Sequence, residues 1–156
     1  MTNNYILRNI RYALNLDDPA MLEIFRSSGH EIDSVTLEAL LKAEDEQGHV
    51  LCSDRVLGLF LDGLITMKRG RREGQADRAA IAASTLTNND VLKKIRIALE
   101  LREEQMLRIF GLGSVDMSGS ELTALFRKPG HKHYKECGDQ FLRYFLKGLA
   151  LWQKGR

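Results

Sequence analysis

Two cysteines are the residues of this chain best suited to nucleophilic chemistry, and each lies where the sequence predicts the start of a helix. His49 precedes Cys52 by three residues, so a general base could stand beside that thiol. A helix N-terminus lowers the pKa of a nearby thiol, which is one requirement for reactivity. Cys137 has Tyr134 at the same spacing, so the pattern is not repeated. We therefore favour two small buried cysteines over a catalytic one.

The same segments contain the ligands of a conceivable zinc site. His49, Cys52, His133 and Cys137 would supply two nitrogens and two sulfurs, a set that tetrahedral zinc accepts. However, the ligand spacings differ between the two segments, and neither contains a Cys-x-x-Cys pair. A cysteine- or zinc-dependent enzyme is thus the less favoured alternative, and we expect no catalytic residue, metal or cofactor.

The segment 127–135, which we call the basic loop, has the most distinctive polar composition: Arg-Lys-Pro-Gly-His-Lys-His-Tyr-Lys. Basic residues with an aromatic one suit contacts to phosphates and stacking on a base. A solvated loop of this composition would need no function, and that interpretation is the favoured one. A second basic run at 68–72 could extend the surface. The candidate binding residues are Arg71, Arg72, Arg127, Lys128, Lys132, Tyr134 and Lys135.

These residues belong to a duplicated chain. Shifting the sequence by 85 residues aligns it with itself without a gap, and 25 of 70 paired positions are identical. Such self-similarity indicates one structural unit used twice. We call residues 1–70 module 1 and residues 87–156 module 2. The linker, 71–86, contains an alanine-rich stretch that predicts a short helix at 76–83.

The two modules differ in charge although the whole chain has a net charge of only +2. Module 1 contains 7 Lys and Arg against 11 Asp and Glu, whereas module 2 contains 13 against 8. The contrast is greatest at the basic loop, whose module 1 counterpart includes Glu44, Asp45 and Glu46. Attraction between the modules or drift of solvated faces would explain it, and so would a polyanionic partner of module 2. The excess of positive charge in module 2 is below that of a strongly basic nucleic-acid domain. We therefore favour attraction between the modules or drift of solvated faces over a polyanionic partner.

Apolar periodicity predicts four helices in each module and almost no strand. Leu7, Ile10 and Leu14 form one such stripe, and Leu92, Ile95 and Leu99 repeat it. We predict an all-α protein of two tandem, pseudo-symmetric helical modules of about four helices each, packed together. The predicted helices span about 4–16, 17–28, 34–42 and 53–68 in module 1, and 89–101, 102–112, 118–128 and 138–153 in module 2.

Glycines and paired polar residues predict how each module is held together. Gly63 and Gly148 fall inside the fourth helix, where glycine costs about 1 kcal/mol relative to alanine, so close helix approach is expected. The shared Thr-Asn-Asn, which includes Asn4 and Asn89, precedes the first helix and suits capping.

A second shared pair predicts a link between helices. Arg11 borders the apolar stripe of the first helix, and Asp54 lies in the first turn of the fourth. We predict an ion pair between them, repeated as Arg96 with Asp139.

Three shared motifs resemble the YehS-like family of bacterial proteins, a tandem domain of unknown function. They are Asn-Asn-x-x-Leu-(Arg/Lys)-x-Ile-Arg-x-Ala-Leu at 3–14 and 88–99, Met-Leu-x-Ile-Phe at 21–25 and 106–110, and Cys-x-Asp-x-x-Leu-x-x-Phe-Leu-x-Gly-Leu at 52–64 and 137–149. The resemblance implies a small cytoplasmic protein and brings no established activity to any residue.

The expected function is therefore non-catalytic binding, as an uncharacterised helical adaptor with a protein partner or self-association. Nucleic-acid binding through the basic loop is the alternative. Two cysteines and no visible secretory signal predict a cytoplasmic location. The longest apolar run, 56–65, is interrupted by Asp62 and is too short to span a bilayer, so no membrane partner is expected.

Overall fold

The computed structural model describes residues 1–70 and 85–155, and this part of the chain contains eight α-helices and no strand. It divides into two compact units, Met1–Leu86 and Thr87–Arg156. The all-α prediction with four helices in each module is confirmed. Arg71, Arg72 and the short helix predicted at 76–83 lie outside the described residues.

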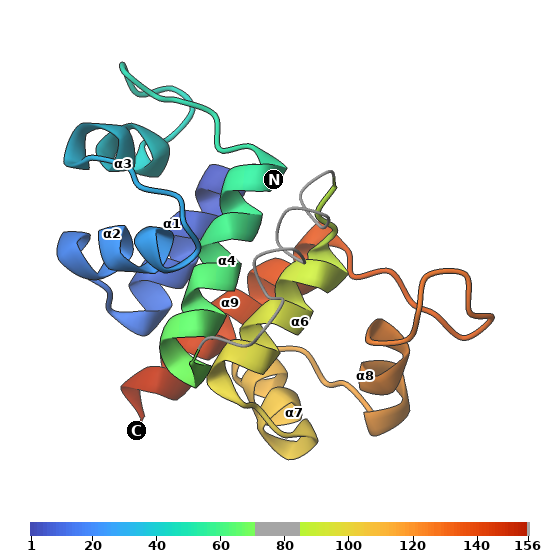
Figure 1. Cartoon of the computed structure of the whole chain (residues 1–156). Helices are drawn as coiled ribbons and strands as arrows, with labels where there is room; N and C mark the ends of the chain where they lie inside the picture. Colours follow the sequence, from blue (N-terminus) through green and yellow to red (C-terminus); the bar gives the residue numbers. More distant parts are fainter. Residues whose placement is uncertain (71–84, 156) are drawn as a thin grey trace. The chain divides into compact units, whose positions relative to one another are not determined.

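The helices of each module follow the same order along the chain (Figure 1). Each observed helix begins or ends within a few residues of its prediction, and the third helices are the shortest. Module 1 contains α1 (Asn3–Leu14), α2 (Asp18–Ser27), α3 (Ser34–Leu41) and α4 (Asp54–Arg69). Module 2 contains α6 (Asn88–Leu99), α7 (Glu103–Leu112), α8 (Gly119–Leu125) and α9 (Asp139–Lys154).

The second and fourth helices of each module form its main helix–helix contact, α2 with α4 and α7 with α9. Buried phenylalanines meet across it, with ring centres 5.2 Å apart for Phe25 and Phe60 and 5.1 Å apart for Phe110 and Phe145. The wide apolar faces of α4 and α9 supply much of each core.

Glycine allows the helices to approach closely at this contact. A Cβ on Gly63 would lie 1.9 Å from the backbone oxygen of Ile24, and one on Gly148 would lie 1.9 Å from that of Ile109. No real side chain tolerates such distances. The predicted reason for a glycine inside each fourth helix is confirmed.

Asn4 and Asn89 are buried and do not cap their helices, so the capping prediction is wrong for them. Thr2 and Thr87 are the N-caps, and Thr87 forms the predicted capping box with Asp90. The Asn4 amide instead donates to the Leu40 and Val50 oxygens, both at 2.8 Å, and accepts from the Cys52 nitrogen at 3.0 Å.

Asn89 repeats the pattern with the Leu125 and Lys135 oxygens, both at 2.9 Å, and with the Cys137 nitrogen at 2.9 Å. One buried amide therefore holds both ends of the long loop before the fourth helix in each module.

The predicted ion pair between Arg11 and Asp54 is wrong, as is its repeat between Arg96 and Asp139. Asp54 accepts from Asn3 at 2.7 Å, and Asp139 accepts from Asn88 at 2.8 Å. These asparagines are the first residues of α1 and α6, and their side chains bond directly to the first residue of the fourth helix. Arg11 instead pairs with Asp18 at 2.5 Å, at the start of α2. Arg96 donates through Nε to the Leu101 oxygen at 3.0 Å.

Candidate functional site

The two cysteines are buried, and their thiols are not activated. Burial raises the pKa of Cys52 to about 12, and the neighbouring Asp54 carboxylate acts in the same direction. Burial and Asp139 likewise raise the pKa of Cys137 to about 11. The prediction that a helix N-terminus would lower these pKa values is therefore wrong, because desolvation of the thiolate outweighs the field of the helix. The favoured alternative, two small buried cysteines, agrees with this environment.

The histidines near the cysteines do not complete a catalytic pair or a metal site in the described residues. The Cys52 thiol donates to the Ser53 oxygen at 3.7 Å, and His49 Nε2 is buried with no hydrogen-bond partner there. His133 is exposed whereas Cys137 is buried. Within residues 1–70 and 85–155, no three His, Cys, Asp or Glu side chains gather where they could hold a metal ion.

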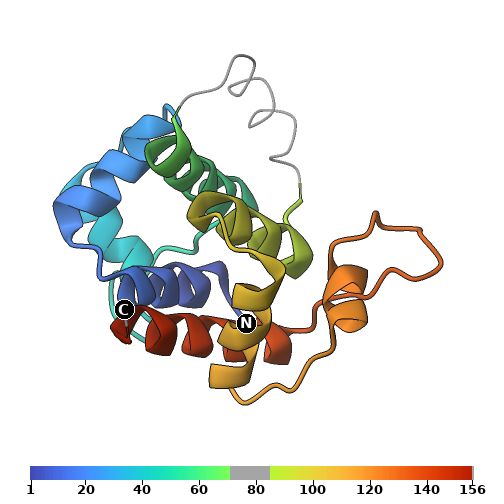
Figure 2. The same ribbon diagram turned by 90° about the horizontal axis from the view of Figure 1, so that it is seen from below.

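The basic loop leaves α8 and extends away from the helices of its own module before it returns to α9 (Figures 1 and 2). Both of its ends are fixed. The Asn89 amide bonds to the Leu125 and Lys135 oxygens, and the Lys135 nitrogen donates to the Ala124 oxygen at 3.0 Å. Positive φ at Gly130, 93°, supports the tight turn that follows Pro129. The loop therefore protrudes from a base that hydrogen bonds hold at both ends.

The cations of the basic loop fall into two groups. Arg127, Lys128 and Lys132 are exposed, and no ion pair or side-chain hydrogen bond joins them to any other described residue. Lys135 is engaged, because its ammonium lies 3.7 Å from the Glu121 carboxylate and 4.8 Å from the centre of the Phe141 ring. Tyr134 is half-buried, and this burial raises its pKa. Only the first three cations are fully available to a partner.

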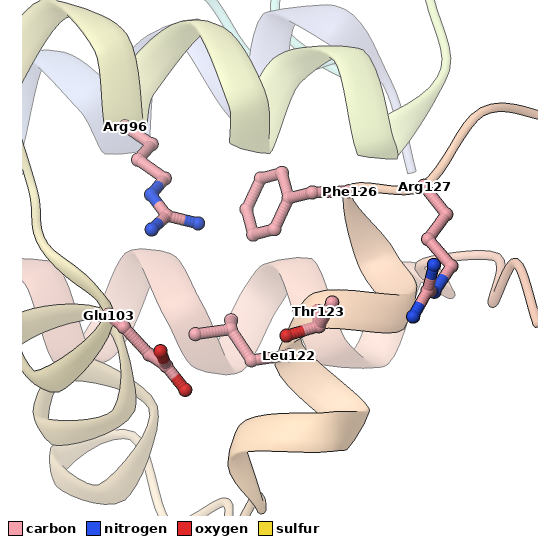
Figure 3. Close-up of a pocket in the computed structure, with 6 residues that line it drawn as sticks. All are labelled: Arg96, Glu103, Leu122, Thr123, Phe126 and Arg127. Atoms are coloured by element: carbon pink, nitrogen blue, oxygen red, sulfur yellow. The ribbon is translucent and has the colours of Figure 1, made fainter.

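A pocket of about 190 Å³ opens beside the start of this loop, between α6, α7 and α8 (Figure 3). Its apolar surface comes from buried Leu122 and half-buried Phe126. The Arg96 guanidinium lies 4.8 Å from the centre of the Phe126 ring, and Arg127 stands on the far side of that ring in Figure 3. The remaining lining residues, Glu103 and Thr123, are exposed.

Hydrogen bonding leaves most of the polar atoms of this pocket available. Arg96 uses Nε for the Leu101 oxygen, and its two terminal nitrogens bond to no described residue. The Thr123 hydroxyl donates to the Gly119 oxygen at 2.9 Å and can still accept. The Glu103 carboxylate forms no ion pair or hydrogen bond with any described residue. A ligand here would meet donors, an acceptor and an aromatic ring together.

The equivalent position in module 1 has a different chemistry. Arg11 and Asp18 align with Arg96 and Glu103, and they form an ion pair. Leu41 aligns with Phe126, so the arginine of module 1 has no aromatic ring at this position. The aligned residue for Thr123 is Glu38, which adds a negative charge.

Phe126, Glu103 and Thr123 were not predicted as site residues from the sequence, and Arg96 was predicted to have a structural role only. One signal could have found the pocket: the ungapped repeat places an aromatic residue at 126, next to Arg127, where module 1 has a leucine. The arrangement around it depends on side chains from three helices, which spacing along the chain does not reveal.

The fold and this site define a class: an all-α protein built from two copies of one helical module, with the polar pocket in the second copy. The chain belongs to the family described as "Protein of unknown function (DUF1456)", whose family model matches twice, at residues 3–70 and 88–155. It is 42% identical over 153 residues to "Uncharacterized protein YehS" of Escherichia coli (strain K12), covering 98% of this chain and 97% of that protein. No solved structure matches the chain. The resemblance drawn from the shared motifs is thereby confirmed.

None of the helices in the described residues is both long enough and apolar enough to cross a bilayer.

Proposed function

We propose that this protein is a non-catalytic binding protein whose module 2 binds nucleic acid through the basic loop. The observation that carries the proposal is the state of Arg127, Lys128 and Lys132, which are exposed and unpaired among the described residues. Three unpaired cations in one loop with fixed ends present a positive surface that a phosphate backbone would fit.

The comparison between modules supports the same proposal. Glu44, Asp45 and Glu46 occupy the module 1 positions that correspond to the basic loop, so the shared fold does not require positive charge there. A feature that one copy has and the other lacks is not needed for folding of the module. The charge is therefore available for a task specific to module 2.

The environment of the thiols supports a non-catalytic role. With pKa values of about 12 and about 11, Cys52 and Cys137 are protonated at neutral pH. Thiols in this state are poor nucleophiles and poor metal ligands.

The proposed test measures binding of fluorescein-labelled, twenty-nucleotide single-stranded RNA and DNA by fluorescence anisotropy. We expect the double substitution Lys128→Glu and Lys132→Glu to weaken binding by tenfold or more at about 50 mM salt, since each reversal replaces an attraction with a repulsion. The matched control reverses Lys93 and Lys147, two exposed lysines on α6 and α9, with the same change in net charge. Equal loss in both variants would show a general charge effect, and no binding by the unmodified protein would refute the proposal.

An adaptor role with a protein partner, or self-association, is the second candidate. Val35, Val50 and Leu51 are exposed apolar residues of module 1, and the Val50 nitrogen donates to the Ala39 oxygen, which brings this loop onto α3. Contiguous exposed apolar side chains, such as the neighbouring Val50 and Leu51, are typical of a protein-binding surface. Affinity capture from lysate with and without nuclease separates the candidates, because a protein partner survives the nuclease. Sedimentation of Leu51→Asp beside the unmodified protein tests self-association.

A further inference from the structure

The pocket of module 2 matches the chemistry of a single unpaired nucleobase. From its lining residues we infer that one base of a single strand enters this pocket while the basic loop follows the phosphates. The inference rests on the proposed function and deepens it, because it names the residues that bind a base and requires that the nucleic acid be single-stranded. It follows from the volume, the kinds of surface and the position of the pocket.

The volume suits one flat ring system. About 190 Å³ is below the range of about 300–1,000 Å³ that is usual for pockets enclosing a whole drug-sized ligand. A group projecting from a larger molecule fits this size better than a free metabolite does. A base of an extended strand is such a group, since its sugar and phosphates remain outside.

The surfaces of the pocket are those that proteins use to hold bases. Unpaired bases stack on aromatic rings and on arginine guanidinium planes, and the pocket is lined by both Phe126 and Arg96, whose guanidinium lies over the phenylalanine ring. Leu122 adds an apolar surface beside them. The Glu103 carboxylate is an acceptor without a donor among the described residues, and carboxylates accept from the exocyclic amino group of cytosine. An anion alone would not need this carboxylate, which would repel it.

The position of the pocket connects it to the basic loop. Phe126 lines the pocket and Arg127, the next residue, both lines the pocket and opens the loop. A base held at Phe126 thus places its own phosphate near Arg127 and the following phosphates toward Lys128 and Lys132. Duplex nucleic acid cannot use the pocket because its bases are stacked and paired.

The test compares three twelve-nucleotide DNA strands that carry cytosines, thymines or abasic sites throughout, and a cytosine RNA strand. We expect the abasic strand to bind about tenfold more weakly than the cytosine strand, because it lacks a base to stack. Thymine has no exocyclic amino group, so its strand should bind with intermediate affinity. The cytosine RNA arm shows whether the 2′-hydroxyl contributes.

Two substitutions connect these differences to the pocket. Phe126→Leu introduces the residue that module 1 has at this position, and it should reduce the advantage of cytosine over abasic strands to less than about threefold. Glu103→Gln should reduce the preference for cytosine over thymine. Glu104→Gln is the matched control, because Glu104 pairs with Arg102 and does not line the pocket. Thermal unfolding followed by circular dichroism confirms that each variant is folded.

The outcomes separate this inference from the proposed function. Equal, salt-dependent binding of base-bearing and abasic strands would overturn the base pocket and leave the loop as a phosphate-binding surface. Base discrimination that Phe126→Leu leaves unchanged in folded protein would also overturn the pocket. Absence of binding to every strand would refute both.

Discussion

The Arg96 guanidinium lies 4.8 Å from the centre of the Phe126 ring, a contact that module 1 cannot make because Leu41 replaces the phenylalanine. Its counterpart Arg11 instead donates to Asp18 at 2.5 Å. In module 2 no ion pair joins Arg96 to Glu103 among the described residues. The arginine at this position therefore neutralises the Asp18 carboxylate in module 1, whereas the Glu103 carboxylate of module 2 remains available.

The buried amides of Asn4 and Asn89 should be essential to the stability of their modules. Asn4→Ala removes three hydrogen bonds and leaves the buried oxygen of Leu40 without this partner. We expect a loss of about 3 kcal/mol in the free energy of unfolding, measured by urea titration with circular dichroism. Asn9→Ala is the control, since Asn9 bonds only to the Tyr5 oxygen of its own helix, and it should change stability by less than about 0.5 kcal/mol. Equal effects of the two substitutions would contradict the assigned role.

Alanine substitutions along α4 should have opposite effects at two glycines. Gly63→Ala would place a Cβ 1.9 Å from the Ile24 oxygen and force α2 away from α4, which we expect to cost about 3 kcal/mol or more. At Gly58 nothing lies within 4 Å of an added Cβ, so Gly58→Ala should stabilise the protein by about 0.5–1 kcal/mol through helix propensity. Thermal unfolding of both variants tests the pair. A Gly63→Ala protein as stable as the original would show that the helices can separate at little cost.

The thiols of the folded protein should react slowly. Because burial raises the pKa values to about 12 for Cys52 and about 11 for Cys137, the thiolate fraction at pH 8 is very small. We expect their reaction with a disulfide reagent to be more than about a hundredfold slower in the folded than in the urea-unfolded protein. Rapid reaction of either native thiol would contradict its burial and reopen a catalytic role.

The same pKa values predict a loss of stability at alkaline pH. The folded pKa lies above that of an unfolded thiol, about 8.5, so the folded state binds more protons once the pH exceeds that value. The two thiols make their full contribution to the free energy of unfolding below about pH 8. This contribution decreases as the pH rises toward their folded pKa values of about 11 and 12. Urea unfolding at pH 8 and pH 10 should show a smaller loss for the Cys52→Ala, Cys137→Ala protein than for the original. An identical loss in both would contradict the prediction.

The sequence predicted the helices because apolar periodicity and caps are local signals, and packing agreed with them in both modules. It predicted the close contact at Gly63 and Gly148 because glycine inside a helix otherwise only costs stability. The predicted ion pair between Arg11 and Asp54 was wrong, since the partner of a long side chain depends on distance in three dimensions and not on position in the sequence. Prediction from the sequence also failed for Cys52, where local reasoning recognised the helix N-terminus but not the desolvation around the thiol. Predicting the pocket at Phe126 would have required knowledge of how three helices are arranged in space.

The central claim is that the basic loop of module 2 binds a phosphate backbone. The most direct test is the salt dependence of single-stranded DNA binding. Three free cations, Arg127, Lys128 and Lys132, predict that the logarithm of the association constant falls with the logarithm of salt concentration with a slope of about −2, at about 0.7 per phosphate contact. Lys128→Gln with Lys132→Gln should make the slope shallower by about 1.4, since two of the three contacts are lost. A slope near zero, or one that this substitution leaves unchanged, would contradict the claim.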